Sequence, residues 1–180
     1  FRIGDAGFPL QQLQFSSPGE NKFPNADTGK LLQPSEWYHV AVVYDTEKKT
    51  AVIYVDGREQ SRIEDYGNGE PVNLGKQTRG SDFMFKIGHS YGEPDYMERQ
   101  LDGEICEVRV WNVARSQQEI FDNMYNIEDP ANTPGLQAYW KFNEGEGDIA
   151  KDYTRHGNDA KSYAKATWPT GIEVTQKNKE

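Results

Sequence analysis

The sequence predicts an all-β fold of antiparallel strands with one short helix, and two observations carry this prediction. Apolar residues occur in short runs in which every second residue is apolar. This is the period at which the side chains of a strand reach the same face of a sheet. Gly, Asp, Asn and Pro bound nearly every run, and these residues form the tight turns of a sandwich or barrel.

The first half of the chain is expected to form four strands. They are the alternating runs at residues 10–16, 37–45, 50–56 and a run that ends near residue 64. A loop rich in Pro, Gly and Asn, residues 17–30, follows the first run. Asp56-Gly57 follows the third, and such a pair favours a tight hairpin because both residues tolerate positive φ. We therefore expect three consecutive strands to form a meander over residues 37–64.

The second half adds fewer strands and the helix. Residues 102–111 (DGEICEVRVW) are partly apolar on both faces, as in a central strand. Ser116 and Glu119 form a capping box, which predicts a short helix that ends before Pro130. The other expected elements are strands over residues 83–87, 136–142, 163–168 and 172–175, loops over 65–82 and 89–100, and turns over 143–148 and 152–159. Trp37, Trp111 and Trp140 lie within predicted strands and are expected in the core, with a place on the concave sheet as the alternative for Trp111.

Composition excludes several classes of protein. The 180 residues carry 20 basic and 29 acidic side chains, a formal charge of −9. This balance argues against nucleic acid, since neutralisation of phosphates supplies most of that affinity. No stretch approaches the roughly 18 to 20 continuous apolar residues of a membrane span. Cys106 is the only cysteine, so an internal disulfide and a thiolate metal cluster are excluded, and we expect a packed thiol.

Several segments have the order and spacing of a known family. They are SEWYHVAVVYD at residues 35–45, VIYVDG at 52–57, LDGEICEVRVWN at 101–112 and RSQQEI at 115–120. Over roughly residues 1–125 the chain resembles a laminin G-like domain of the concanavalin A-like lectin/glucanase superfamily. Within it, the chain is most similar to glycan-associated modules of surface proteins of carbohydrate-degrading Gram-negative bacteria. The resemblance implies a jelly-roll β-sandwich, in agreement with the alternation of apolar residues.

The two ends of the chain depart from the family pattern. The opening FRIGDAG resembles the middle of such a domain, so the front strands are either absent or part of a removed segment. Residues 135–159 resemble the pattern that opens these domains. We interpret them as the closing strand of the same sandwich, and the opening strand of a second module is the alternative. The expected organisation is one laminin G-like sandwich over residues 1–175 and a frayed tail over 176–180.

The resemblance also implies where catalytic acids would lie. Glucanases of this superfamily carry three acids at alternate positions of one strand, which places acid and nucleophile in one cleft. The nearest match is Asp102, Glu104 and Cys106, where a thiol replaces the third acid. Glu107 is expected on the opposite face. The sequence therefore predicts a domain without catalytic activity.

Sugar binding instead needs aromatic rings that stack on pyranose faces and polar groups that bridge hydroxyls. Two loops have this composition, and their candidate ligand-binding residues are Tyr91, Glu93, Asp95, Tyr96 and Arg99 in one and Tyr66 and Asn68 in the other. The alternative is that these tyrosines cap the sandwich and that the charges are ordinary loop polarity.

A structural calcium ion is the one cofactor that the family suggests. Asp152, Asn158 and Asp159 could supply the hard oxygen ligands that calcium prefers. No complete twelve-residue calcium loop is present, and a network of Asx turns explains the same residues without metal.

Together these features predict a carbohydrate-binding, lectin-like module that is secreted or on the bacterial cell surface. Its expected partners are an oligo- or polysaccharide and other domains of the same parent chain, with a glycan-degrading system nearby. A structural or adhesion domain that binds proteins is the first alternative. A glycoside hydrolase of the glucanase type is the second.

Overall fold

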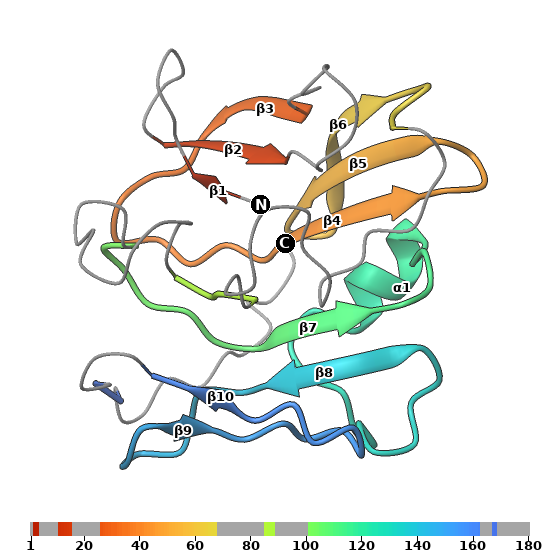
Figure 1. The fold of residues 1–180 in the computed structure, drawn as a ribbon. Coiled ribbons are helices and arrows are strands. Elements are labelled where there is room, and N and C mark those ends of the chain that lie inside the picture. The colour runs from red at the N-terminus through yellow and green to blue at the C-terminus, as the bar shows by residue number, and fades with distance from the viewer. Residues whose placement is uncertain are drawn as a thin grey trace, which may run out of the picture. The chain divides into compact units, whose positions relative to one another are not determined.

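The structure is a computed structural model that describes residues 2–3, 11–15, 26–67, 85–88, 101–162 and 167–168. Its elements in chain order are β1 (Arg2–Ile3), β2 (Gln12–Phe15), β3 (Ala26–Leu31), β4 (Val40–Asp45), β5 (Thr50–Val55), β6 (Arg58–Ile63), β7 (Val108–Trp111), α1 (Gln117–Asp122), β8 (Leu136–Trp140), β9 (Ile149–Ala150) and β10 (Ala160–Lys161) (Figure 1). All of the strand pairings between these elements are antiparallel. The predicted all-β class with one short helix is confirmed. In this described part of the chain, no helix is long and apolar enough to cross a membrane.

Contacts within the chain define two compact units. Unit 1 consists of Phe1–Phe85 and Ala114–Met124, and unit 2 of Lys86–Val113 and Tyr125–Glu180. The predicted domain over residues 1–175 spans both units and stays a prediction.

Unit 1 contains two three-stranded sheets, β1-β2-β3 and β4-β5-β6 (Figure 1). The second sheet is the predicted meander, with β4 paired to β5 from Val40↔Val55 to Asp45↔Thr50. All six residues of β5 are buried. Because β5 is the central strand and its sequence TAVIYV is almost continuously apolar, it supplies core residues to both faces of the sheet.

One predicted loop is partly wrong. We expected residues 17–30 to form a loop, whereas residues 26–30 belong to β3 and pair with β2, from Phe15↔Ala26 to Gln12↔Leu31. The register shifts between Gln12 and Gln14, which indicates a bulge. Backbone pairing does not require apolar side chains, and therefore the alternation of apolar residues did not reveal this strand.

The core of unit 1 is formed by aliphatic and aromatic side chains from separate elements. Val52, Tyr54 and Ile120 form one buried cluster. Tyr66 is fully buried, and its ring centroid lies 5.8 Å from that of Phe15. Trp37, by contrast, is 44% exposed. It precedes β4 rather than lying within it, so the prediction that it belongs to the core is wrong.

Among its described residues, unit 2 contains two antiparallel pairs of strands, β7–β8 and β9–β10 (Figure 1). The strand predicted for residues 102–111 begins only at Val108, because Glu107 has a φ of +58° and leaves the extended conformation. Residues 85–87 are not in a strand, which corrects that part of the prediction for 83–87. Of the two last predicted strands, residues 167–168 are not in a strand, and the others lie outside the described residues.

Two clusters form the core of unit 2. Ala138, Trp140 and Ala150 form the first, and Trp140 is 5% exposed. Trp111 packs against the second cluster, which contains Tyr139 and is otherwise aliphatic. The predicted core position of Trp140 is confirmed, whereas Trp111 is only partly buried at the edge of the core.

Candidate functional site beside helix α1

The turn between β5 and β6 forms one wall of the candidate site. Asp56 and Gly57 have φ angles of +50° and +69°, as the sequence predicted for a tight hairpin. The backbone N–H of His39 donates to Asp56 Oδ1 at 2.9 Å, and the N–H of Asp56 donates to the carbonyl of His39 at 2.8 Å. This pair of bonds fixes the turn to the segment that precedes β4.

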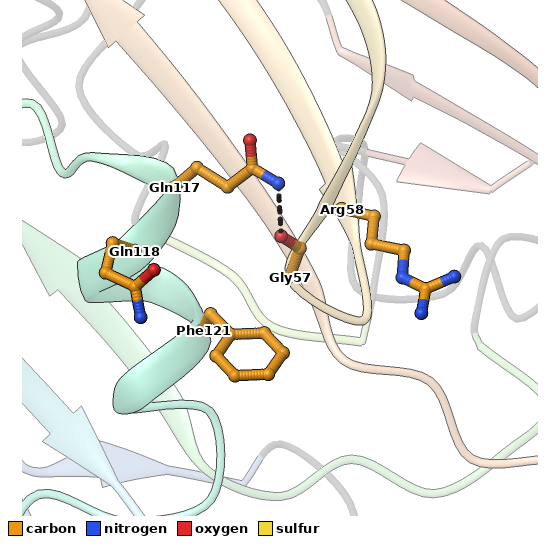
Figure 2. Close-up of a pocket in the computed structure, with 5 residues that line it drawn as sticks. All are labelled: Gly57, Arg58, Gln117, Gln118 and Phe121. Carbon is orange, nitrogen blue, oxygen red and sulfur yellow. Dashed lines mark hydrogen bonds between the residues drawn. The ribbon is translucent and has the colours of Figure 1, made fainter. Parts of the chain in front are cut away.

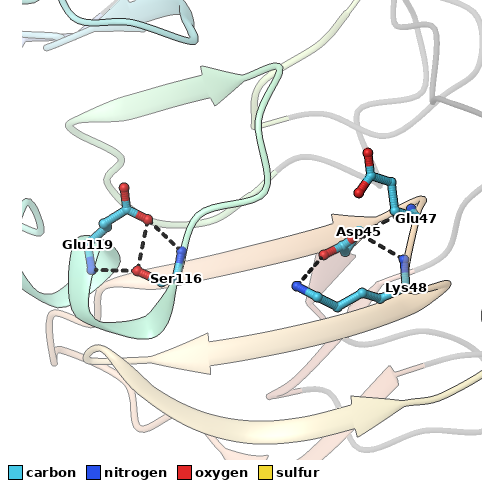
Figure 3. A network of polar contacts seen from close by, with 5 residues as sticks. All are labelled: Asp45, Glu47, Lys48, Ser116 and Glu119. Atoms are coloured by element: carbon cyan, nitrogen blue, oxygen red, sulfur yellow. Dashed lines mark hydrogen bonds and ion pairs between the residues drawn. The ribbon is translucent and has the colours of Figure 1, made fainter.

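Helix α1 forms the other wall, and the predicted capping box starts it (Figure 3). The backbone N–H and the hydroxyl of Ser116 both donate to Glu119 Oε2 at 2.8 Å, and the N–H of Glu119 donates to Ser116 Oγ at 3.3 Å. Arg115 Nη1 lies 3.1 Å from Glu119 Oε1. These contacts satisfy donors that a helix end otherwise leaves open. They fix the start of α1, whose first residue, Gln117, bonds to the β5–β6 turn.

Helix and hairpin meet at Gly57. Gln117 Nε2 donates to the Gly57 carbonyl at 3.0 Å, and Phe121 lies so close that a Cβ on residue 57 would be 2.6 Å from its Cδ2 (Figure 2). Only glycine allows both this close contact with Phe121 and a positive φ at residue 57. Beside the contact is an open pocket of about 430 Å³, lined by Gly57, Arg58, Gln117, Gln118 and Phe121.

The lining combines one aromatic ring, one cation and two amides. Gln117 and Gln118 project from α1, and Arg58 leaves the turn at the start of β6 (Figure 2). Such a set can contact an apolar face and hydrogen-bond several hydroxyl or carboxylate groups. The capping box and the Asp-Gly turn were visible in the sequence, but nothing in the sequence indicated that these segments, 60 residues apart, form one pocket.

Most of the sugar-binding residues predicted from the sequence lie outside the described residues. These are Tyr91, Glu93, Asp95, Tyr96, Arg99 and Asn68. Tyr66 is described, and its ring lies in the core of unit 1, 5.4 Å from the ring of Tyr44. Because no part of Tyr66 is exposed, this corrects the prediction that its ring faces a ligand.

The predicted calcium ligands form a network of hydrogen bonds in unit 2. Asp152 Oδ1 accepts from the backbone N–H groups of Tyr139 at 3.1 Å and Thr154 at 2.9 Å. Asp152 Oδ2 accepts from the hydroxyl of Thr154 at 2.8 Å and the N–H of Asn158 at 2.9 Å. Burial alone would raise the pKa of Asp152, but donation from the Thr154 and Asn158 N–H groups outweighs it and lowers the pKa.

The other two predicted ligands are also engaged within the protein. Asp159 Oδ1 accepts from the N–H of Asp152 at 2.8 Å, and Asn158 Nδ2 donates to the carbonyl of Gln137 at 3.0 Å. Because four donors occupy the roughly four lone-pair sites of the Asp152 carboxylate, this arrangement does not fit a calcium ion. Among the described residues, no group of three or more His, Cys, Asp or Glu side chains could hold a metal. Calcium binding stays an untested prediction.

The positions compared with the catalytic acids of glucanases lie before β7. Asp102, Glu104 and Cys106 are not in a strand, so they do not share the face that alternate strand positions would give them. Burial and, secondarily, the charge of Glu107 raise the pKa of Cys106 to about 11. The thiol is therefore protonated at neutral pH and a poor nucleophile.

A buried polar network in unit 2 was missed by the sequence analysis. The hydroxyl of the fully buried Tyr139 donates to Glu107, whose carboxylate also pairs with Arg109. Burial raises the pKa of Tyr139 to about 12. Arg109 and Tyr139 are opposite each other in the β7–β8 pair. The network thus links the paired strands β7 and β8 to Glu107, the residue that precedes β7.

Comparisons with known proteins agree with this fold. A laminin G family model, described as the concanavalin A-like lectin/glucanases superfamily, matches residues 1–121. A proposed carbohydrate-binding protein of known structure from Bacteroides ovatus ATCC 8483 is 34% identical over 83% of this chain, with a TM-score of 0.67. An S-layer domain-containing protein from Clostridium thermocellum ATCC 27405 is 24% identical over 62% of this chain and 49% of its own, with a TM-score of 0.39. No curated protein matches.

The extent of these matches decides what they show. The chain covers 40% of the length of the Bacteroides ovatus protein. The family model covers 121 of the 180 residues, and it confirms the resemblance found in the sequence. The chain therefore belongs to the concanavalin A-like lectin/glucanases superfamily.

Proposed function

We propose that this chain is a non-catalytic carbohydrate-binding module. The observation that carries the proposal is the match at 34% identity and a TM-score of 0.67 to a proposed carbohydrate-binding protein. Membership of a superfamily that contains lectins supports it. Because the chain covers 40% of that relative's length, we further propose that it works beside other domains of a longer protein, as part of a glycan-degrading system.

The absence of catalysis is part of the proposal and has structural support. A retaining glycosidase needs two carboxyl groups about 5–5.5 Å apart and an inverting one needs about 6.5–9.5 Å, on either side of the scissile bond. Asp102 and Glu104 do not lie on a strand that would aim both into one cleft. The Glu107 carboxylate is engaged by Arg109 and Tyr139. We also propose that the protein acts at the cell surface or outside the cell, because a module that binds polysaccharides meets them there.

The ligand contacts proposed for the loop over residues 89–100 are those of Tyr91, Glu93, Asp95, Tyr96 and Arg99. Stacking of a nucleic-acid base on an aromatic side chain contributes roughly 1–3 kcal/mol. If stacking of a sugar on tyrosine contributes a comparable amount, removal of the tyrosine ring should weaken glycan binding by about tenfold or more. Tyr91→Ala and Tyr96→Ala remove the rings. Tyr91→Phe and Tyr96→Phe are matched controls, because they keep the rings and lose only the hydroxyls.

A glycan array followed by titration calorimetry tests the function with the whole chain. We expect binding to at least one polysaccharide class, weaker in the alanine variants and largely kept in the phenylalanine variants. Failure to bind any glycan would refute the function. Hydrolysis of a bound glycan that disappears in Glu104→Gln would instead establish an enzyme.

A further inference from the structure

The pocket beside α1 lies apart in sequence from the loops that the proposed function uses. Its volume of about 430 Å³ falls within the roughly 300–1,000 Å³ typical of small-molecule sites. It is built by two elements of unit 1, the β5–β6 turn and α1. The bonds at Asp56 and Ser116 fix both elements before any ligand arrives.

Arg58 gives this pocket a positive charge. Among the described residues that line the pocket, Arg58 alone carries a charge. Arg62 and Arg115 are paired with Glu59 and Glu119, whereas the Arg58 guanidinium has no carboxylate partner among the residues that the structure describes. A guanidinium binds a carboxylate through two parallel hydrogen bonds. An anionic group on the ligand would therefore find a matching cation here.

The two glutamines add hydrogen-bonding groups whose positions are fixed. Gln117 uses one amide hydrogen on the Gly57 carbonyl, and Gln118 uses one on Asp122 Oδ1 at 2.8 Å. A primary amide has two donors and a carbonyl acceptor. Within the part of the chain that the structure describes, each side chain therefore has one donor and its oxygen left for a ligand. Sugar hydroxyls, which both donate and accept, match this pattern.

The Phe121 ring supplies an apolar surface in the same pocket. It is half-buried, and its contact with Gly57 holds one edge against the turn. A ring held in this way loses little further entropy when a ligand packs on it. The C–H face of a pyranose is a surface of suitable size and polarity.

We propose that this pocket binds a uronic acid unit of a glycan. Its carboxylate pairs with Arg58, its hydroxyls bond to Gln117 and Gln118, and its C–H face packs on Phe121. The inference rests on the proposed carbohydrate-binding function and names an acidic sugar class and a site for it.

The test uses NMR titrations of the whole chain with trigalacturonic acid and with the neutral trisaccharide galactotriose. We expect trigalacturonic acid to shift the amide signals of Gly57, Gln117 and Gln118, and galactotriose to shift them far less. Arg58→Gln should weaken binding of the acidic trisaccharide by roughly tenfold or more, as expected for loss of a charge-assisted hydrogen bond. Arg58→Lys, which keeps a point charge without the fork, should fall in between.

Arg155→Gln is the matched control, because Arg155 is also exposed and its loss changes the net charge equally. The inference would be overturned if Arg155→Gln weakened binding of trigalacturonic acid as much as Arg58→Gln does. It would also be overturned if the chain bound the acidic and the neutral trisaccharide equally well. Acidic glycan binding with shifts confined to residues outside the pocket would overturn the inference and leave the proposed function intact. No binding of any glycan, on the array or by NMR, would overturn both.

Discussion

Replacing Gly57 with alanine should destabilise unit 1 strongly. Residue 57 has a φ of +69°, and an added Cβ would lie 2.6 Å from Phe121 Cδ2 and 3.3 Å from its backbone Cα. A left-handed conformation costs a residue other than glycine about 1–2 kcal/mol, and overpacking costs about 1–3 kcal/mol more. Loss of unfolded-state entropy on changing glycine to alanine offsets about 0.4–1 kcal/mol. We expect a net decrease of about 2–4 kcal/mol in the free energy of unfolding.

Urea denaturation followed by circular dichroism measures this change. Gly145→Ala is the control, because Gly145 has a φ of +81° and nothing within 4 Å of an added Cβ. It should show the backbone cost alone, about 1 kcal/mol after the same offset. Phe121→Ala removes the clashing ring, so Gly57→Ala should cost less in that background. Equal losses for Gly57→Ala and Gly145→Ala, with no relief from Phe121→Ala, would refute the close packing of turn and helix.

Three other outcomes follow from unit 2. Asp152→Asn should lower the free energy of unfolding at pH 7 by about 1.5–3 kcal/mol, because a carboxylate that accepts four hydrogen bonds is lost. Since folding lowers the pKa of Asp152 below its ordinary value of 3.8, its stabilisation is present above that pH and lost as the pH falls through the folded value. The free energy of unfolding, measured by urea titration, should therefore fall more between pH 7 and pH 3 for the native protein than for Asp152→Asn. A difference in stability between the two proteins that is as large at pH 3 as at pH 7 would contradict this role of Asp152. Addition of EDTA or calcium should leave the melting temperature unchanged, because the Asp152 oxygens are already engaged, and a rise with calcium would show that the network opens to a metal. Cys106, with a pKa of about 11, should react with iodoacetamide at pH 8 more than about a hundredfold more slowly than a free thiol of pKa near 8.5, and rapid alkylation would contradict its burial.

The sequence predicted those parts of the fold that depend on neighbouring residues. The β4–β5–β6 meander, the Asp56-Gly57 turn and the capping box of α1 are all local patterns. Each depends on the preferences of a few consecutive residues for one backbone conformation. That is why they could be predicted without knowledge of tertiary contacts.

The errors occurred where distant residues decide the local structure. Residues 102–111 alternate like a strand, but Glu107 turns to positive φ and bonds through its carboxylate to Arg109 and Tyr139. Tyr139 is 32 residues away from Glu107, so no local pattern contains this contact. Trp37 shows the converse case, because an aromatic residue next to a strand was expected in the core and is 44% exposed.

The candidate site also depends on contacts between residues that are distant in the sequence. Its ring, cation and amides come from residues 57–58 and 117–121, and only the folded chain brings them together. The sequence directed attention to loops rich in tyrosine, because composition can identify polar and aromatic residues but cannot place them side by side. Of the loop candidates, the structure describes Tyr66, which is a core residue. Composition alone could not distinguish a tyrosine that packs in the core from one that faces a ligand.

The residues of this pocket differ in how much they contribute to the stability of the fold in addition to the proposed binding. Gly57 and Phe121 pack on each other, and Gln117 bonds the turn to the helix, so a loss of binding after changing any of them would have two explanations. Gln118 bonds to Asp122 within α1 and carries less of the fold. Arg58 is exposed and makes no ion pair within the described part of the chain. A substitution at Arg58 therefore alters the charge of the pocket with the least change in stability, and the behaviour of Arg58→Gln and Arg58→Lys decides whether the pocket recognises acidic sugars.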